Sequence, residues 1–261
     1  MDGLLLRGTV VAASGSGGAA VLVHGGGATR DEGGFFTRIA EGLAVGGVSS
    51  LRFDLRGHGA SEGRQEELTL AGVVNDIRAA ADEVRRLTGA GEIAVLGTSF
   101  GGGLAALFAA RYAPLVHRLV LINPLLNYKK RFIDDKPYWA DEQIDIDAGR
   151  ELSEQGSLVH SPTFRLGRPL LNEVFYLRPH EELHAIVAPT LFLHGTKDTF
   201  IPIDSSREYV RQISGESRLI EVDGAQHGLA AHDDPQYLDP QTVMWQAQAV
   251  RDITEWVTSH G

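Results

Sequence analysis

One serine lies in surroundings that favour nucleophilic chemistry. Ser99 is the centre of the pentapeptide GTSFG at 97–101, directly after the apolar run Ile93–Leu96. This spacing fits G-x-S-x-G, a sharp strand-to-helix turn that lifts a serine above a sheet edge and admits only glycine two residues before and after it. A tightly packed turn without chemistry is the alternative. The preceding strand and the Ala-rich helix that follows favour a nucleophile.

A serine hydroxyl needs a base to activate it and an acid to orient that base. If the serine lies in this kind of turn, both partners are expected downstream, in the order acid and then histidine. Asp198 follows an apolar run at 190–195, and His227 follows the last apolar run at 218–224. Two alternatives stay open: Asp198 as the cap of a helix near Ile203, and His232 as the base.

Backbone amides must stabilise the oxyanion that forms during acyl transfer. The amide of Phe100, the residue after the serine, is one predicted donor. The segment 24–27, HGGG, supplies amides without obstructing side chains, and Gly26 is the predicted second donor. A phosphate-binding loop is disfavoured, because no Lys-Ser/Thr pair follows these glycines and the G-x-G-x-x-G spacing is missing.

Short apolar runs alternate with helical periodicity along most of the chain. Apolar residues recur every three to four positions over 70–87 and 243–257, as on one buried helix face. Alternation of this kind predicts an α/β fold with a mostly parallel, doubly wound sheet. The predicted strands are 4–12, 19–24, 48–54, 93–97, 118–123, 190–195 and 218–224.

One long segment interrupts the alternation. Residues 125–187 are rich in charges, aromatic residues and prolines, and they contain no clear strand. Because so long an insertion exceeds a simple loop, we expect a cap or lid with some helix. The predicted organisation is therefore an α/β core made of residues 1–124 and 188–261, with a cap insertion over 125–187.

Composition excludes several classes of function. The 261-residue chain has a formal net charge of −10 and no cysteine, which excludes disulfides and thiolate chemistry and argues against nucleic acid and anionic membranes as partners. No export signal or membrane-spanning run is visible, so a cytoplasmic location is expected. No histidine spacing suggests a metal site, and no cofactor is expected. The oligomeric state stays open, with a homodimer as one option.

Four segments carry a family resemblance: HGGG, RFDLRGHGASEG at 52–63, GTSFGG and HGTKDTFIP. In this order they resemble the α/β-hydrolases, most of all serine esterases similar to cinnamoyl and feruloyl esterases, with enzymes similar to monoacylglycerol lipase near by. The resemblance implies an α/β-hydrolase fold and a Ser99–Asp198–His227 triad. It also implies oxyanion donors at Phe100 and in the 24–27 loop. Gly26 and Thr98 depart from the bulkier residues common in that branch, which points to a different acyl pocket.

The function predicted for this site is a serine carboxylesterase acting on a small-molecule ester, with an aryl or other bulky acyl group preferred. A thioesterase or acyltransferase with the same triad, and a binding protein without activity, are the alternatives. Lys129–Arg131 are interpreted as a solvated charge run that could meet a substrate carboxylate. The candidate substrate contacts are Gly27, Phe35, Tyr128, Tyr138, Trp139, Phe164, Phe175 and Tyr176.

Overall fold

A seven-stranded sheet forms the centre of the protein, and it confirms the predicted α/β fold. The computed structural model describes residues 2–15, 18–232 and 234–259. Within these residues the sheet has the order β1-β3-β2-β4-β5-β10-β11, with β1 antiparallel to β3 and the other pairs parallel. The strands are β1 (Gly8–Val11), β2 (Ala19–Val23), β3 (Ser49–Phe53), β4 (Ile93–Thr98), β5 (Val116–Ile122), β10 (Thr190–Gly195) and β11 (Ser217–Val222).

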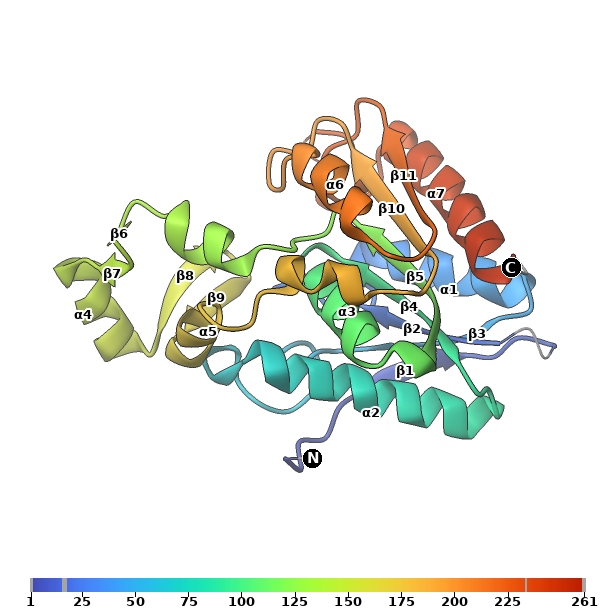
Figure 1. Cartoon of the computed structure of the whole chain (residues 1–261), viewed down its shortest axis with the longest axis horizontal. Coiled ribbons are helices and arrows are strands. Elements are labelled where there is room, and N and C mark those ends of the chain that lie inside the picture. The colour runs from blue at the N-terminus through green and yellow to red at the C-terminus, as the bar shows by residue number, and fades with distance from the viewer. Residues whose placement is uncertain (1, 16–17, 233, 260–261) are drawn as a thin grey trace.

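Helices cover both faces of this sheet, as Figure 1 shows, with α2 and α3 on one side and α1 and α7 on the other. Alternate strand residues divide between the two layers, as expected for strands buried on both faces. Val21 and Val95 belong to the core under α2 and α3, whereas Leu22 and Leu96 belong to the core under α1 and α7. The helices of this part are α1 (Phe35–Val45), α2 (Leu70–Thr88), α3 (Ser99–Arg111), α6 (Asp204–Tyr209) and α7 (Pro240–Thr258).

The first predicted strand is shorter than expected. The run 4–12 contributes only β1, because the N–H groups before Gly8 bond to side chains, while the carbonyl groups of Leu5 and Arg7 accept the N–H groups of Glu62 and Asp54. The N–H groups of Leu5 and Arg7 donate to the carboxylate of Glu62 and the hydroxyl of Ser61. An apolar run alone does not reveal that its backbone groups find other partners.

The segment 125–187 projects from one end of the sheet in Figure 1 as far as α5, and its last part returns beside α3. It contains two small hairpins in addition to helix, whereas no clear strand was expected. The hairpins escape detection because their strands are short and their residues only partly apolar. The elements are a π-helix (Lys130–Asp134), β6 (Trp139–Ala140), β7 (Gln143–Ile144), α4 (Ile146–Gln155), β8 (Ser157–Ser161), β9 (Phe164–Gly167), α5 (Arg168–Glu173) and two 3-10 helices (Pro179–Glu181 and Leu183–Ala185).

Several contacts hold this segment, hereafter the cap, against the core. Gln65 exchanges two hydrogen bonds with the backbone of Thr163 and Arg165 near β9. The carboxylate of Glu173 accepts the N–H groups at the start of α2. In the described part of the chain, no helix has the length and apolar character needed to cross a membrane.

Candidate active site

The turn between β4 and α3 holds Ser99 in a strained conformation. The serine has a φ of 50°, a left-handed value that non-glycine residues seldom adopt. A Cβ on Gly97 would lie 2.6 Å from the carbonyl oxygen of Gly101, and one on Gly101 would lie 2.4 Å from that of His24. Both glycines are therefore required by the close approach of backbone, as the G-x-S-x-G spacing predicts.

A continuous set of hydrogen bonds joins the three residues that the sequence singled out. His227 Nε2 lies 3.0 Å from Ser99 Oγ, and His227 Nδ1 lies 2.7 Å from Asp198 Oδ2. These groups come from the carboxyl ends of β4, β10 and β11, which meet at one edge of the parallel sheet. The arrangement can remove the serine proton and orient the histidine ring.

The Asp198 carboxylate is surrounded by donors. Oδ1 accepts the N–H groups of Phe200 and Ile201 at 2.8 and 2.9 Å, and Oδ2 accepts Asn123 Nδ2 at 2.7 Å. Burial by itself raises the pKa of the Asp198 carboxyl, but bonds from His194 and His227 outweigh burial and hold that pKa below its usual range. The carboxylate therefore stays ionised and can stabilise a protonated His227.

Two residues beside Asp198, Asn123 and His194, were not singled out from the sequence. Asn123 directly follows β5, and this position after a buried strand was the signal that could have identified it. His194 Nε2 lies 2.9 Å from the carbonyl oxygen of Ile201 and 3.3 Å from Asp198 Oδ2.

The structure does not favour the two alternative roles, Asp198 as a helix cap and His232 as the base. The amides that donate hydrogen bonds to Asp198 lie in a loop, because α6 begins only at Asp204. His232 lines a neighbouring hollow with Thr199 and Gln226, whereas His227 contacts the serine.

The glycine loop after β2 leaves one amide for an oxyanion. The N–H of Gly25 donates to Glu32 Oε2 at 2.7 Å, and that of Gly27 donates to His58 Nε2 at 3.0 Å. Among the described residues, the N–H of Gly26 makes no hydrogen bond, and Gly26 lines the same cavity as Ser99. Gly27, a predicted substrate contact, therefore supports the loop through His58 instead.

An aromatic ring of the cap fills the space beside Gly26 where a side chain would otherwise lie. A Cβ on Gly26 would lie 2.7 Å from the ring of Phe164, the first residue of β9. That ring also packs edge to face with Phe100, at 5.2 Å between centroids. The ring of Phe164 therefore occupies the space that a side chain at position 26 would need.

A buried carboxyl lies beside the triad. Glu32, in the turn before α1, bonds to Gly25 and has its oxygens within 4 Å of the position that a Gly25 Cβ would occupy. Burial raises the pKa of Glu32 to about 7, against the lowering effects of the Gly25 amide and of nearby His227.

A cavity of about 180 Å³ opens at Ser99, between the core and the cap. Its polar floor carries the serine and His227, and four phenylalanines contribute to its wall. The lining residues are Gly26, Ser99, Phe100, Leu125, Arg131, Phe132, Lys136, His160, Ser161, Phe164, Phe200, Ile201 and His227.

Most predicted substrate contacts lie outside the lining of this cavity, and their contact with substrate stays a prediction. Tyr128 is fully buried, and its hydroxyl donates to the carbonyl of Phe100. Phe35, the first residue of α1, is buried in the core on the α1 and α7 side of the sheet, and Tyr176 is 88% exposed. Tyr138, Trp139 and Phe175 are partly buried against the core that the cap shares with the α2 and α3 side of the sheet. Aromatic residues stabilise a small insertion by packing together, so aromatic content alone does not identify its pocket-facing members.

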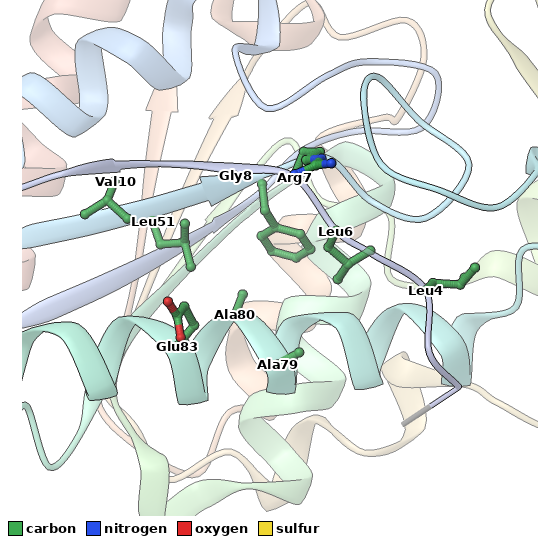
Figure 2. A pocket seen from close by; sticks show the side chains of 10 residues that line it. Leu4, Leu6, Arg7, Gly8, Val10, Leu51, Ala79, Ala80 and Glu83 are labelled. Carbon is green, nitrogen blue, oxygen red and sulfur yellow. The ribbon is translucent and has the colours of Figure 1, made fainter.

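A second hollow lies far from this chemistry. This hollow has a volume of about 370 Å³ and lies between β1 and α2. Figure 2 shows Leu6 and Leu51 pointing toward Ala80 on the helix, whereas Arg7 points away. The lining is apolar apart from Arg7 and Glu83, and it includes none of the triad residues. We interpret this hollow as loose packing at the sheet edge.

Comparisons with known proteins agree with this geometry. The family model of the alpha/beta hydrolase fold matches residues 19–156, and the chain belongs to this family. More particularly, it is 28% identical to a monoacylglycerol lipase of Mycolicibacterium smegmatis, over 93% of this chain and 89% of the relative. A proline iminopeptidase, PfmaB of Pestalotiopsis fici, is 27% identical over 69% of this chain and 75% of its own.

Solved structures share the whole fold. Est1E from Butyrivibrio proteoclasticus with ferulic acid bound superposes with a TM-score of 0.80 at 21% identity, covering 99% of this chain and 98% of Est1E. The monoacylglycerol lipase of Paleococcus ferrophilus gives 0.71 at 23% identity, covering 98% and 100%. The predicted resemblance to the α/β-hydrolases is thereby confirmed.

Proposed function

We propose that the protein is a serine carboxylesterase that forms an acyl-enzyme on Ser99. The observation that carries this proposal is the unbroken hydrogen-bonded series Ser99–His227–Asp198 at the floor of a cavity. The similarity to a monoacylglycerol lipase over nearly the full chain supports a carboxylic ester as the substrate.

In this reaction His227 takes the proton of Ser99 as the hydroxyl attacks the ester carbonyl. The amides of Gly26 and Phe100 stabilise the oxyanion, and the ionised Asp198 stabilises the imidazolium. His227 then gives the proton to the departing alcohol. Water, activated by the same histidine, releases the acid from the serine and restores the enzyme.

The substrate is proposed to be a small ester with an aromatic or otherwise bulky group. Phe100, Phe132, Phe164 and Phe200 supply the apolar wall that such a group needs. Thioester hydrolysis and acyl transfer would use the same triad. Comparing an aryl ester with an acyl thioester, with and without an added alcohol acceptor, distinguishes them.

Labelling with a fluorophosphonate tests the nucleophile. We expect one adduct, on Ser99, and turnover of 4-nitrophenyl esters that Ser99→Ala abolishes while the folded circular dichroism spectrum persists. The control Ser153→Ala, on the exposed face of α4, should keep both labelling and turnover. His227→Ala should abolish turnover and His232→Ala should not.

Two results would contradict the proposal. An absence of any serine adduct would favour a binding protein on a hydrolase scaffold. Turnover that survives Ser99→Ala, or that is lost only in His232→Ala, would overturn the assigned roles.

A further inference from the structure

The cap places two positive side chains over the cavity that holds Ser99. Arg131, from the π-helix, and Lys136, just beyond it, both line this cavity with His160 of β8. We infer that the substrate carries an anionic group, of which a carboxylate is the simplest, and that Arg131 and Lys136 bind it while Ser99 attacks the ester. This inference rests on the proposed esterase function and specifies its substrate class.

The neighbouring lysines form ion pairs with acidic residues, and in this they differ from Arg131 and Lys136. Lys129 lies 2.8 Å from Asp134 and 3.0 Å from Glu142, so its charge is balanced within the cap. Lys130 is likewise balanced, 2.6 Å from Asp135.

Arg131 and Lys136 make no side-chain hydrogen bond or ion pair with any residue that the structure describes. Acidic residues are not scarce, since the chain has 34 of them against 24 Lys and Arg. Asp134 and Asp135 lie in the same short segment, yet both pair with the lysines outside the catalytic cavity. The cavity therefore has two positive side chains that no ion pair within the described residues neutralises, although Asp135 is near enough to act on the charge of Lys136.

Like charges in a partly buried site repel one another, and this repulsion is visible at His160. Burial, with the charges of Lys136 and Arg131, lowers the pKa of His160 to about 4, so its ring is neutral at neutral pH. The pKa of Lys136 is lowered by its burial and by Arg131. A bound anion would remove this repulsion, because it adds the missing opposite charge.

His160 adds no charge to this part of the cavity. Its ring packs edge to face against Phe132, at 5.1 Å between centroids, and its Nδ1 is buried away from solvent. Arg131 and Lys136 thus supply two charges beside a neutral histidine and an aromatic wall.

Matched esters test this inference through selectivity. The first pair is mono-4-nitrophenyl adipate and 4-nitrophenyl hexanoate, which differ by a carboxylate on the acyl side. The second pair is 4-carboxyphenyl hexanoate and phenyl hexanoate, which differ on the alcohol side. We expect kcat/KM to favour the carboxylate in at least one pair, and that pair identifies the side of the ester that meets the cations.

The double variant Arg131→Gln/Lys136→Gln should lower the ratio of carboxylate to neutral kcat/KM about tenfold, the effect expected of one charged hydrogen bond. Arg131→Lys should retain part of the preference. The control Arg150→Gln removes a cap charge outside the cavity and should leave the ratio as it is in the wild type. Added salt should raise KM for the favoured carboxylate ester alone.

Binding provides a readout independent of turnover. In Ser99→Ala, calorimetry should show the carboxylate ester of the favoured pair binding more tightly than its neutral counterpart, and the double variant should remove the difference. Equal binding of both ligands, or an unchanged kcat/KM ratio in the double variant, would overturn the anionic substrate while leaving the esterase intact. Ester turnover that does not depend on Ser99 would instead overturn the proposed function.

Discussion

The two sides of the catalytic cavity treat their polar groups differently. On the core side, Asp198 accepts four hydrogen-bond donors, and the neighbouring loop pairs Arg56 with Asp76. On the cap side, Arg131 and Lys136 have no acidic partner within the described residues. Saturated groups hold a fixed geometry, whereas unsatisfied groups are available to a ligand. We therefore propose that the core carries out the reaction and that the cap selects the substrate.

The way each side is anchored agrees with this difference. Parallel strands fix the ends of β4, β10 and β11 at one sheet edge, so Ser99 and Asp198 follow fully buried strands and His227 follows the partly exposed outer strand. The cap depends on short hairpins and on a few contacts with Gln65 and Glu173. A change in the core should therefore affect every ester, and a change in the cap should distinguish among esters.

The largest expected effect comes from the core. Asp198→Asn keeps the shape of the side chain but removes the charge that stabilises protonated His227, so kcat should fall about ten-thousand-fold for all esters. Steady-state kinetics on neutral and carboxylate esters measures it. Asp204→Asn, the same change on the exposed start of α6, is the control. If the fall in kcat differed strongly between neutral and carboxylate esters, the core would also contribute to selectivity, and the proposed division between core and cap would be wrong.

The junction between the two sides gives the next effect. Gly26→Ala places a methyl group 2.7 Å from the Phe164 ring, so the loop and its oxyanion amide must shift. We expect kcat to fall about a hundredfold, as for a misplacement of about 1 Å. Adding Phe164→Leu should restore part of this loss, because the clashing ring atoms are then absent.

A double-mutant cycle on kcat for a neutral ester measures this coupling between Gly26 and Phe164. Strictly additive losses in kcat would mean that the Phe164 ring does not contact the glycine loop. The cap would then lie further from the oxyanion site than the structure places it.

The smallest expected effect concerns Glu32, the one group discussed on the core side whose charged form is disfavoured by burial. Its folded pKa, about 7, exceeds the ordinary value of 4.5, so folding favours the protonated carboxyl. The stability that depends on this proton is present below pH 4.5 and is lost as the pH rises through 7. Glu32→Gln cannot ionise and should gain about 1–3 kcal/mol over the wild type in unfolding free energy between pH 5 and pH 8.

Urea unfolding at the two pH values measures this gain. Glu41→Gln, on the exposed side of α1, should show the same difference from the wild type at both. If Glu32→Gln did not increase the free energy of unfolding at pH 8, the Glu32 carboxylate would be hydrated and its ionisation would not destabilise the core.

Much of the core could be predicted from the sequence because its determinants are local. The run 190–195 coincides with β10, and the helical periodicity over 70–87 corresponds to α2. Gly97 and Gly101 reveal the serine turn because only glycine tolerates backbone at 2.4–2.6 Å. The juxtaposition of Ser99, Asp198 and His227 follows from strand ends that must share one sheet edge.

The cap could not be predicted to the same degree. Six aromatic residues there were equal candidates for the pocket, and Phe164 alone lines it, while Tyr128 supports Phe100 from below. Lys129, Lys130 and Arg131 read as one charge run, yet only the arginine lines the catalytic cavity.

The sequence by itself determined the fold and the nucleophile turn, because periodicity and backbone sterics act over a few neighbouring residues, whereas the order of the triad was implied by the family resemblance. The tertiary structure decided which amide of the glycine loop stays unpaired, which cations lack a partner, and which ring fills the space at Gly26. Those outcomes depend on contacts between residues far apart in the chain, such as Gly27 with His58 and Gly26 with Phe164. No local pattern encodes such contacts.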